Sequence, residues 1–146
     1  MKAIIQLVSS ASVTVEGQVI GKIETGIVAL CGFGHGDTEQ ALSPMLEKIV
    51  NMRIFPDEKG RMNESMIDID GSLLLIPQFT LFADTKKGRR PEFFSAKEPK
   101  EASLLFDTLC REAEILVPGR IQKGSFGAHM MLSLVNDGPV TINLEN

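Results

Sequence analysis

Apolar residues form two uninterrupted runs in this chain, and both predict buried strands. The first run extends from Gly26 to Cys31 and the second from Leu73 to Ile76. A strand covered on both faces of a sheet has such a continuous apolar pattern. Shorter apolar or alternating runs, bounded by turn residues, predict further strands at 3–8, 13–15, 19–23, 121–123, 130–135 and 140–144.

Two other segments carry apolar residues at helical spacing. One has Ala41, Leu42, Met45, Leu46, Ile49 and Val50 on one face, and the other, after Pro99, has Ala102, Leu105, Phe106, Leu109 and Ala113. Pro44 predicts either a kink in the first helix or a start at Ser43 with the proline in the first turn. The order of elements predicts one α/β domain over residues 1–146, with mixed β-sheets and helices packed on one side.

A glycine-rich turn follows the first buried run, with Gly32, Gly34 and Gly36 at alternate positions. It lacks the Gly-Lys-Ser/Thr of a phosphate loop and the third glycine of the dinucleotide pattern. We therefore expect a strand-to-helix turn capped by Asp37 or Thr38.

The formal net charge of the 146 residues is −4, which argues against a general nucleic-acid binder. Four cations nevertheless share one polar loop: Lys86, Lys87, Arg89 and Arg90. That loop is either a solvated surface or a local clamp for phosphates.

Two cysteines, Cys31 and Cys110, lie in apolar surroundings without a C-x-x-C motif, and no metal-ligand spacing occurs. We expect no metal and no cofactor. Free buried thiols fit a reducing cytoplasm. The sequence contains neither a signal peptide nor an apolar stretch long enough for a membrane span, so we expect a cytoplasmic protein that does not bind membranes.

The second buried run ends abruptly in Pro77-Gln78-Phe79-Thr80. Thr80 could be a nucleophile, but it would need a neighbouring base, and neither histidine, His35 or His129, is near it in sequence. Alternatively, Thr80 caps a turn, or the backbone N–H groups of residues 78–80 bind an anion or a carbonyl.

Gly138-Pro139 interrupts the last two apolar runs. Since proline cannot donate to a β-ladder, the segment is typical of an edge strand or a turn. A cis Gly-Pro bond is the other alternative, and its two carbonyls would form a rigid pair of acceptors for an amine or a chiral centre.

Combined in order, several segments resemble the D-aminoacyl-tRNA deacylases (D-Tyr-tRNA deacylases) nearly from end to end. They lie at 11–15, 53–55, 62–63, 78–81, 83–85, 88–91, 124–128 and 133–141. The resemblance implies a three-layer α/β/β fold and a homodimeric hydrolase. Its substrate would be D-aminoacyl-tRNA, whose ester bond it cleaves to proofread chirality in translation.

The resemblance also assigns residues. Gln78, Phe79 and Thr80 would form the catalytic pocket, and Pro77 and Met130 would contact the substrate. A cis Gly138-Pro139 would enter the partner subunit's pocket, where its carbonyls read the α-amino group. The family implies tRNA binding, for which the four cations at 86–90 are the candidates. Thr80 has been proposed as nucleophile in the family, whereas the better-supported view uses backbone groups and the 2′-hydroxyl of tRNA.

Three positions depart from the family pattern: Leu7, Pro77 and His129 stand where most members have Arg, Ser and Asp. Phe79 is kept, as in members specific for D-amino acids. Two alternatives therefore stay open. One is an editing deacylase of relaxed or altered chirality that acts on glycyl- or L-alanyl-tRNA, and the other is a tRNA-binding module without catalysis.

Overall fold

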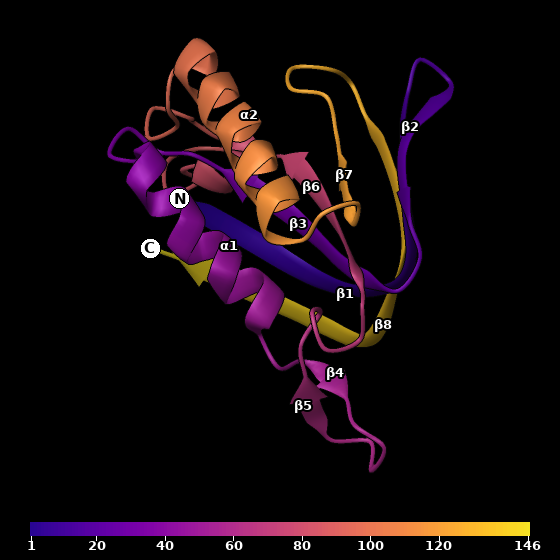
Figure 1. Ribbon diagram of the computed structural model, residues 1–146. Helices are drawn as coiled ribbons and strands as arrows, with labels where there is room; N and C mark the ends of the chain where they lie inside the picture. The colour runs from indigo at the N-terminus through magenta and orange to yellow at the C-terminus, as the bar shows by residue number, and fades with distance from the viewer.

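The long strand β1 (Lys2–Val15) is shared by two parts of one sheet. Its first half pairs antiparallel with β3 (Gly26–Gly32), and its second half pairs with β2 (Gln18–Ile23). On its other side β8 (Met131–Glu145) follows β1 along almost its whole length. The computed structural model describes residues 1–146, and Figure 1 shows β2 and β8 curling up beside the rest of the sheet.

Parallel pairs extend the sheet beyond β3. β6 (Ser72–Pro77) pairs with β3, and β7 (Ile121–Lys123) pairs with β6. The helices α1 (Leu42–Asn51) and α2 (Pro99–Leu116) cover one face (Figure 1). The remaining elements are short: the 3₁₀ turns η1 (Glu39–Ala41) and η2 (Phe79–Phe82), and a hairpin of β4 (Phe55–Pro56) and β5 (Met62–Glu64).

Alternate side chains of β6 enter two separate cores. Leu73 and Leu75 belong to the larger core, where both helices pack on the sheet. Leu74 and Ile76 belong to a smaller core with side chains of β1, β2 and β3. A strand that is buried on both faces has to be apolar throughout, which explains its uninterrupted run. The predicted α/β class, with helices on one side and three layers, is confirmed.

The sequence predicted two separate strands within β1, at 3–8 and 13–15, and two within β8, at 130–135 and 140–144. Both predictions are wrong, because each strand continues through local irregularities. In β8, Asn136 lies opposite Val8 and Thr141 lies opposite Gln6, so four residues, 137–140, face Leu7 alone. The extra residues are extruded from the ladder as a bulge, and pairing resumes beyond them. Gly138-Pro139 thus interrupts the ladder without ending the strand.

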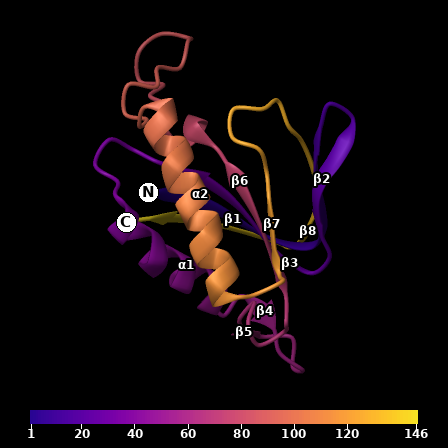
Figure 2. The same ribbon diagram turned by 45° about the horizontal axis from the view of Figure 1, so that its top comes forward.

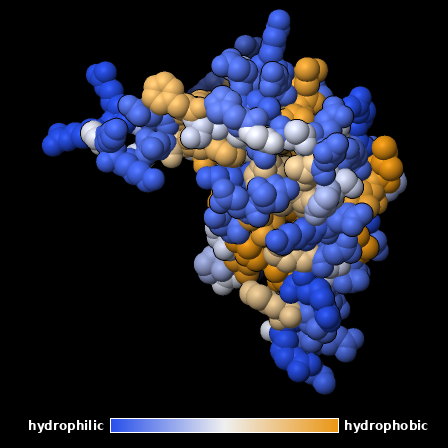
Figure 3. Space-filling model, turned by 90° about the vertical axis from the view of Figure 1, so that its left-hand side faces the viewer, coloured by the Kyte–Doolittle hydropathy of each residue, from blue (hydrophilic) through white to orange (hydrophobic).

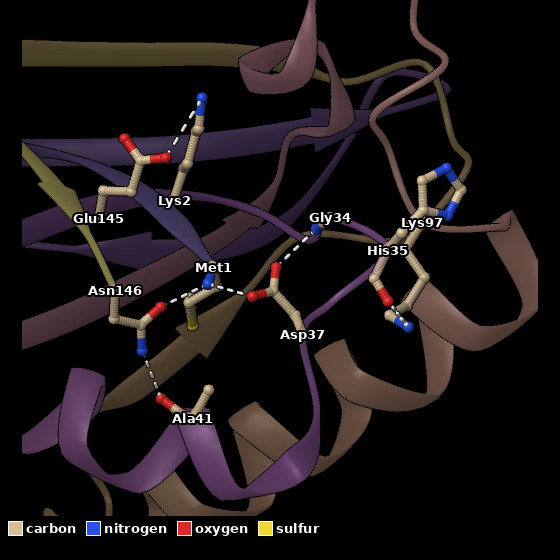
Figure 4. A network of polar contacts seen from close by, with 9 residues as sticks. All are labelled: Met1, Lys2, Gly34, His35, Asp37, Ala41, Lys97, Glu145 and Asn146. Atoms are coloured by element: carbon tan, nitrogen blue, oxygen red, sulfur yellow. Dashed lines mark hydrogen bonds and ion pairs between the residues drawn. The ribbon is translucent and has the colours of Figure 1, made fainter.

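The first predicted helix begins at Leu42, so Pro44 lies in its first turn as the second alternative required. The predicted cap is wrong: Thr38 precedes η1, but its side chain makes no capping hydrogen bond. Asp37 instead accepts the backbone N–H of Gly34 at 2.6 Å and pairs with the amino group of Met1 at 2.5 Å (Figure 4). Its carboxylate therefore ties the glycine-rich turn to β1.

Close packing explains two glycines of this turn. A Cβ atom on Gly32 would lie 2.7 Å from the carbonyl oxygen of Gln78, and one on Gly34 would lie 2.6 Å from the ring of Phe82. The turn is therefore a packing element that lets η2 lie directly against the end of β3.

Neither helix combines the length and the apolarity that crossing a bilayer requires.

Candidate active site

The ladder between β3 and β6 ends with one hydrogen bond. The N–H of Gln78 donates to the carbonyl of Cys31 at 2.7 Å, and the chain then turns into η2. The next two N–H groups, of Phe79 and Thr80, have no acceptor within the chain. Of the three N–H groups expected to bind a ligand, two are therefore free to do so, and the sheet uses the third.

The hydroxyl of Thr80 is not hydrogen-bonded to a basic side chain. Its oxygen accepts a hydrogen bond from the side-chain amide of Gln78 at 2.5 Å. His35 is hydrogen-bonded through Nε2 to the backbone carbonyl of Phe94 at 2.6 Å, and His129 is an exposed side chain. The hydroxyl of Thr80 also does not cap η2, which has no side-chain capping hydrogen bond. The N–H of Ala83 at the end of η2 donates instead to the backbone carbonyl of Thr80.

An apolar groove of about 360 Å³ opens beside η2. The Phe79 ring, 54% exposed, meets the Phe93 ring edge-on with centroids 5.0 Å apart. Phe126 and Ala102 line the groove further in. Lys97 stands on its wall, where Nζ donates to the backbone carbonyl of His35 and pairs with Glu101, each at 3.2 Å.

Sequence reasoning missed Phe93 and Phe126 as groove residues. The available signal was apolar rings in polar surroundings: Phe93 follows the basic loop together with Phe94, and Phe126 lies between Gly124 and Gly127. Both side chains are half-buried, and aromatic side chains that stay partly accessible often mark a ligand surface.

Pro77 and Met130 meet around Gly124. A Cβ atom on Gly124 would lie 2.7 Å from the Met130 sulfur and 3.3 Å from Cδ of Pro77. The sulfur also accepts the N–H of Ser125 at 3.4 Å. Pro77 and Met130 therefore lie together at the end of β6, directly before Gln78, Phe79 and Thr80. Of these five predicted residues, Phe79 lines the groove itself.

Gly138 and Pro139 do not lie in this region. They are exposed in the bulge of β8, and the peptide bond between them is cis. Pro77 lies level with Ala3 of β1 and Leu144 of β8. Three strand spacings and about four residues along the strands then place the bulge roughly 20 Å from the pocket of its own chain.

The four predicted cations stand on an arm that begins just after η2. Backbone hydrogen bonds of 2.7 and 2.9 Å between Asp84 and Glu92 close the base of the arm. Lys86, Lys87, Arg89 and Arg90 are exposed beyond it, and none forms an ion pair. Figure 2 shows the arm extending from the top of the molecule, and Figure 3 shows a hydrophilic projection standing clear of the body.

The thiols are poor candidates for nucleophiles. Burial raises the pKa of Cys31 far above its ordinary value, and burial also raises the pKa of Cys110 to about 11. Both groups are therefore protonated at neutral pH.

No group of three or more His, Cys, Asp or Glu side chains is placed to hold a metal ion. The region is a pocket of backbone donors and aromatic surface on an α/β/β fold.

Comparison with known proteins identifies the fold family. The family model described as D-Tyr-tRNA(Tyr) deacylase matches residues 4–145, and the chain belongs to this family. A relative from Thermosipho africanus, named D-aminoacyl-tRNA deacylase, is 45% identical over 100% of this chain and 97% of its own length. A second relative of that name, from Ectopseudomonas mendocina, is 50% identical over 99% of both chains.

Two solved structures share the fold. One, titled c-Myc DNA Unwinding Element Binding Protein, has a TM-score of 0.94 at 39% identity and covers 100% of this chain and 99% of its own. The other, titled as a probable eukaryotic D-amino acid tRNA deacylase, has a TM-score of 0.83 at 15% identity and covers 98% of both chains. The second likeness concerns the fold alone.

Proposed function

We propose that this protein hydrolyses the ester bond between a D-amino acid and the 3′-terminal adenosine of tRNA. Its membership of the deacylase family supports this reaction, and so do the two unpaired N–H groups of Phe79 and Thr80. The two free thiols fit the reducing cytoplasm, where charged tRNA is used.

In the proposed reaction, water adds to the ester carbonyl, and the electron pair of the carbonyl moves to its oxygen. The N–H groups of Phe79 and Thr80 stabilise the resulting negative charge, as preorganised donors do in acyl transfer. The bond to the ribose oxygen then breaks, that oxygen takes a proton, and a free D-amino acid and tRNA result. The neighbouring ribose hydroxyl would relay a proton from the attacking water to the departing ribose oxygen, so the reaction needs no side-chain base and no Thr80 nucleophile.

The surroundings of η2 suit the end of a charged tRNA. The three phenylalanine rings of the groove offer an apolar surface for the terminal adenine, since aromatic side chains commonly stack on unpaired bases. The basic arm continues from the same segment, where it would contact the phosphates that precede the adenosine. Local positive charge is enough for this role despite the negative net charge.

Selection of the D-amino acid requires a second copy of the chain in this proposal. The Gly138 and Pro139 carbonyls would read the α-amino group, but they are too far from the pocket of their own chain. In a homodimer, each bulge would enter the partner's pocket. An uncharged outer face next to the bulge fits such a contact, with Met131 and Val135 64% and 58% exposed on either side of Ser133.

Of the three departures from the family pattern, Pro77 directly precedes Gln78, and His129 is an exposed residue directly before Met130. Leu7 is buried in the larger core. Because Pro77 stands before Gln78 where most of the family has Ser, the second candidate is an editing deacylase of relaxed or altered chirality that accepts glycyl- or L-alanyl-tRNA.

Purified protein is expected to release D-tyrosine or D-aspartate from charged tRNA and to leave the L-aminoacyl esters intact. Measuring glycyl-, L-alanyl- and D-aminoacyl-tRNA side by side separates the two candidates. Faster cleavage of the glycyl or L-alanyl ester would favour the second. Binding of charged tRNA without release of any amino acid would overturn both and leave a tRNA-binding module.

Mixed dimers test the contribution of the partner. Phe79→Glu places a charge in the pocket, and Pro139→Glu places one on the bulge, so each variant alone is expected to be inactive. A dimer of the two variants keeps one intact site, made of one chain's pocket and the other chain's bulge. Co-expression is expected to restore about a quarter of the wild-type activity, because half of the dimers are mixed and each keeps one of two sites. No recovery in isolated mixed dimers would contradict the shared site.

Thr80→Ala is expected to retain kcat/KM within about tenfold of wild type, since it removes one hydrogen bond and no nucleophile. Thr25→Ala is the matched control, because Thr25 is exposed and precedes β3 at the opposite end of the sheet. A loss of about a thousandfold or more, with the fold intact, would make Thr80 the nucleophile.

The chain contains two Lys-Gly-Arg tips with a glycine of positive φ, so the arm has an internal control. Gly88 of the arm has φ 71°, and Gly60 of the β4–β5 hairpin has φ 72°. Changing Lys87 and Arg89 to Gln is expected to weaken tRNA binding and to reduce the slope of log K against log salt by about 1.5. The same change at Lys59 and Arg61 is expected to leave the slope unchanged. Equal slopes in both variants would mean that the arm is a solvated surface that does not contact the phosphates of tRNA.

A further inference from the structure

Three polar side chains close the base of the bulge that carries Gly138 and Pro139. The amide of Asn136 donates to Oε1 of Gln6 at 2.5 Å and to Oγ1 of Thr141 at 3.2 Å. The Thr141 hydroxyl donates to the same Gln6 oxygen at 2.7 Å. We call Gln6, Asn136 and Thr141 the polar clasp.

The clasp also reaches the extruded backbone. Oδ1 of Asn136 accepts the N–H of Val140 at 3.1 Å, across the bulge. Asn136 and Thr141 are the last paired residues on the two sides of the bulge, and Gln6 is the ladder partner of Thr141. The three side chains therefore join the two ends of the bulge to each other and to β1.

The residues of the bulge have little other support. Asp137, Gly138 and Pro139 are exposed, and only Val140 packs against the larger core. Their one facing residue on β1, Leu7, directs its apolar side chain into the core and so offers the bulge no polar side-chain group. The direction of the Gly138 and Pro139 carbonyls thus depends on how the two ends of the bulge are held.

We propose that the clasp is a positioning device that sets the orientation of the Gly138 and Pro139 carbonyls and thereby the discrimination between D- and L-aminoacyl esters. The inference rests on the proposed function, and Gln6, Asn136 and Thr141 act through the bulge rather than on the substrate. A displacement of about 1 Å at a recognition element can cost about a hundredfold in rate. Stereochemical selectivity is therefore the property most sensitive to losing the clasp.

A first experiment needs no substrate. Amide hydrogen exchange at Val140 is expected to accelerate about fivefold or more in Asn136→Ala, which removes the acceptor of that N–H. Asn143→Ala is the matched control, because Asn143 is an exposed asparagine of β8 without a side-chain hydrogen bond. Unchanged exchange at Val140 in Asn136→Ala would overturn the clasp whatever the protein's activity.

A second experiment compares two changes at Thr141. Thr141→Val keeps the shape and the strand preference but removes the hydroxyl, whereas Thr141→Ser keeps the hydroxyl. The ratio of D- to L-aminoacyl-tRNA cleavage is expected to fall about tenfold or more in the valine variant and to stay near wild type in the serine variant. Unfolding transitions of both variants show whether the fold is intact.

The outcomes separate the two proposals. If the wild-type protein cleaves no D-aminoacyl ester, the proposed function fails, while the exchange experiment still tests the clasp. If the wild type is active and Thr141→Val keeps its full selectivity, the clasp fails and the proposed function stands. An equal loss of selectivity in the valine and serine variants would also overturn the clasp, because the hydroxyl would then not matter.

Discussion

The hydrogen bond from Gln78 N–H to the Cys31 carbonyl is the constraint on which the proposed site depends. It is the last bond of the β3–β6 ladder, and it fixes where the chain leaves the sheet. The next two N–H groups are unpaired because the chain turns there before any further strand can accept them. Gly32 makes this turn possible, since a side chain at that position would collide with the Gln78 carbonyl. The donors of the site are therefore set by strand register and by the absence of a side chain.

The same principle applies at the other candidate element, the bulge of β8. There the ladder is interrupted where four residues face one, and none of the four has a ladder partner. In the proposed site the pocket would supply donors and the bulge would supply acceptors, which together suit a substrate with a carbonyl and an amine. Because strand geometry separates the two elements by roughly 20 Å in one chain, a site that uses both requires two copies.

Local patterns in the sequence predicted much of this architecture, and tertiary pairing accounts for the rest. The two continuous apolar runs gave the buried strands correctly, because burial on both faces leaves a local signature. The continuity of β1 and β8 could not be predicted, since bulges depend on register with a distant partner. Asp37 was misassigned as a cap because its partner, the Met1 amino group, is 36 residues away. The clasp was missed for the same reason, as Gln6 and Asn136 are 130 residues apart.

A site built from backbone groups also explains why its chemistry is hard to see in the sequence. N–H and C=O groups are present at every residue, so only turn and bulge signals mark the useful ones. Side chains have supporting roles in the proposed site: phenylalanines shape the groove, the arm would concentrate charge beyond it, and the clasp would hold the bulge. The exposed cations of the arm and the backbone donors of the proposed site would act in different surroundings. The arm can attract an anionic polymer in solvent, while dipoles in a less polar groove act more strongly on the reacting carbonyl.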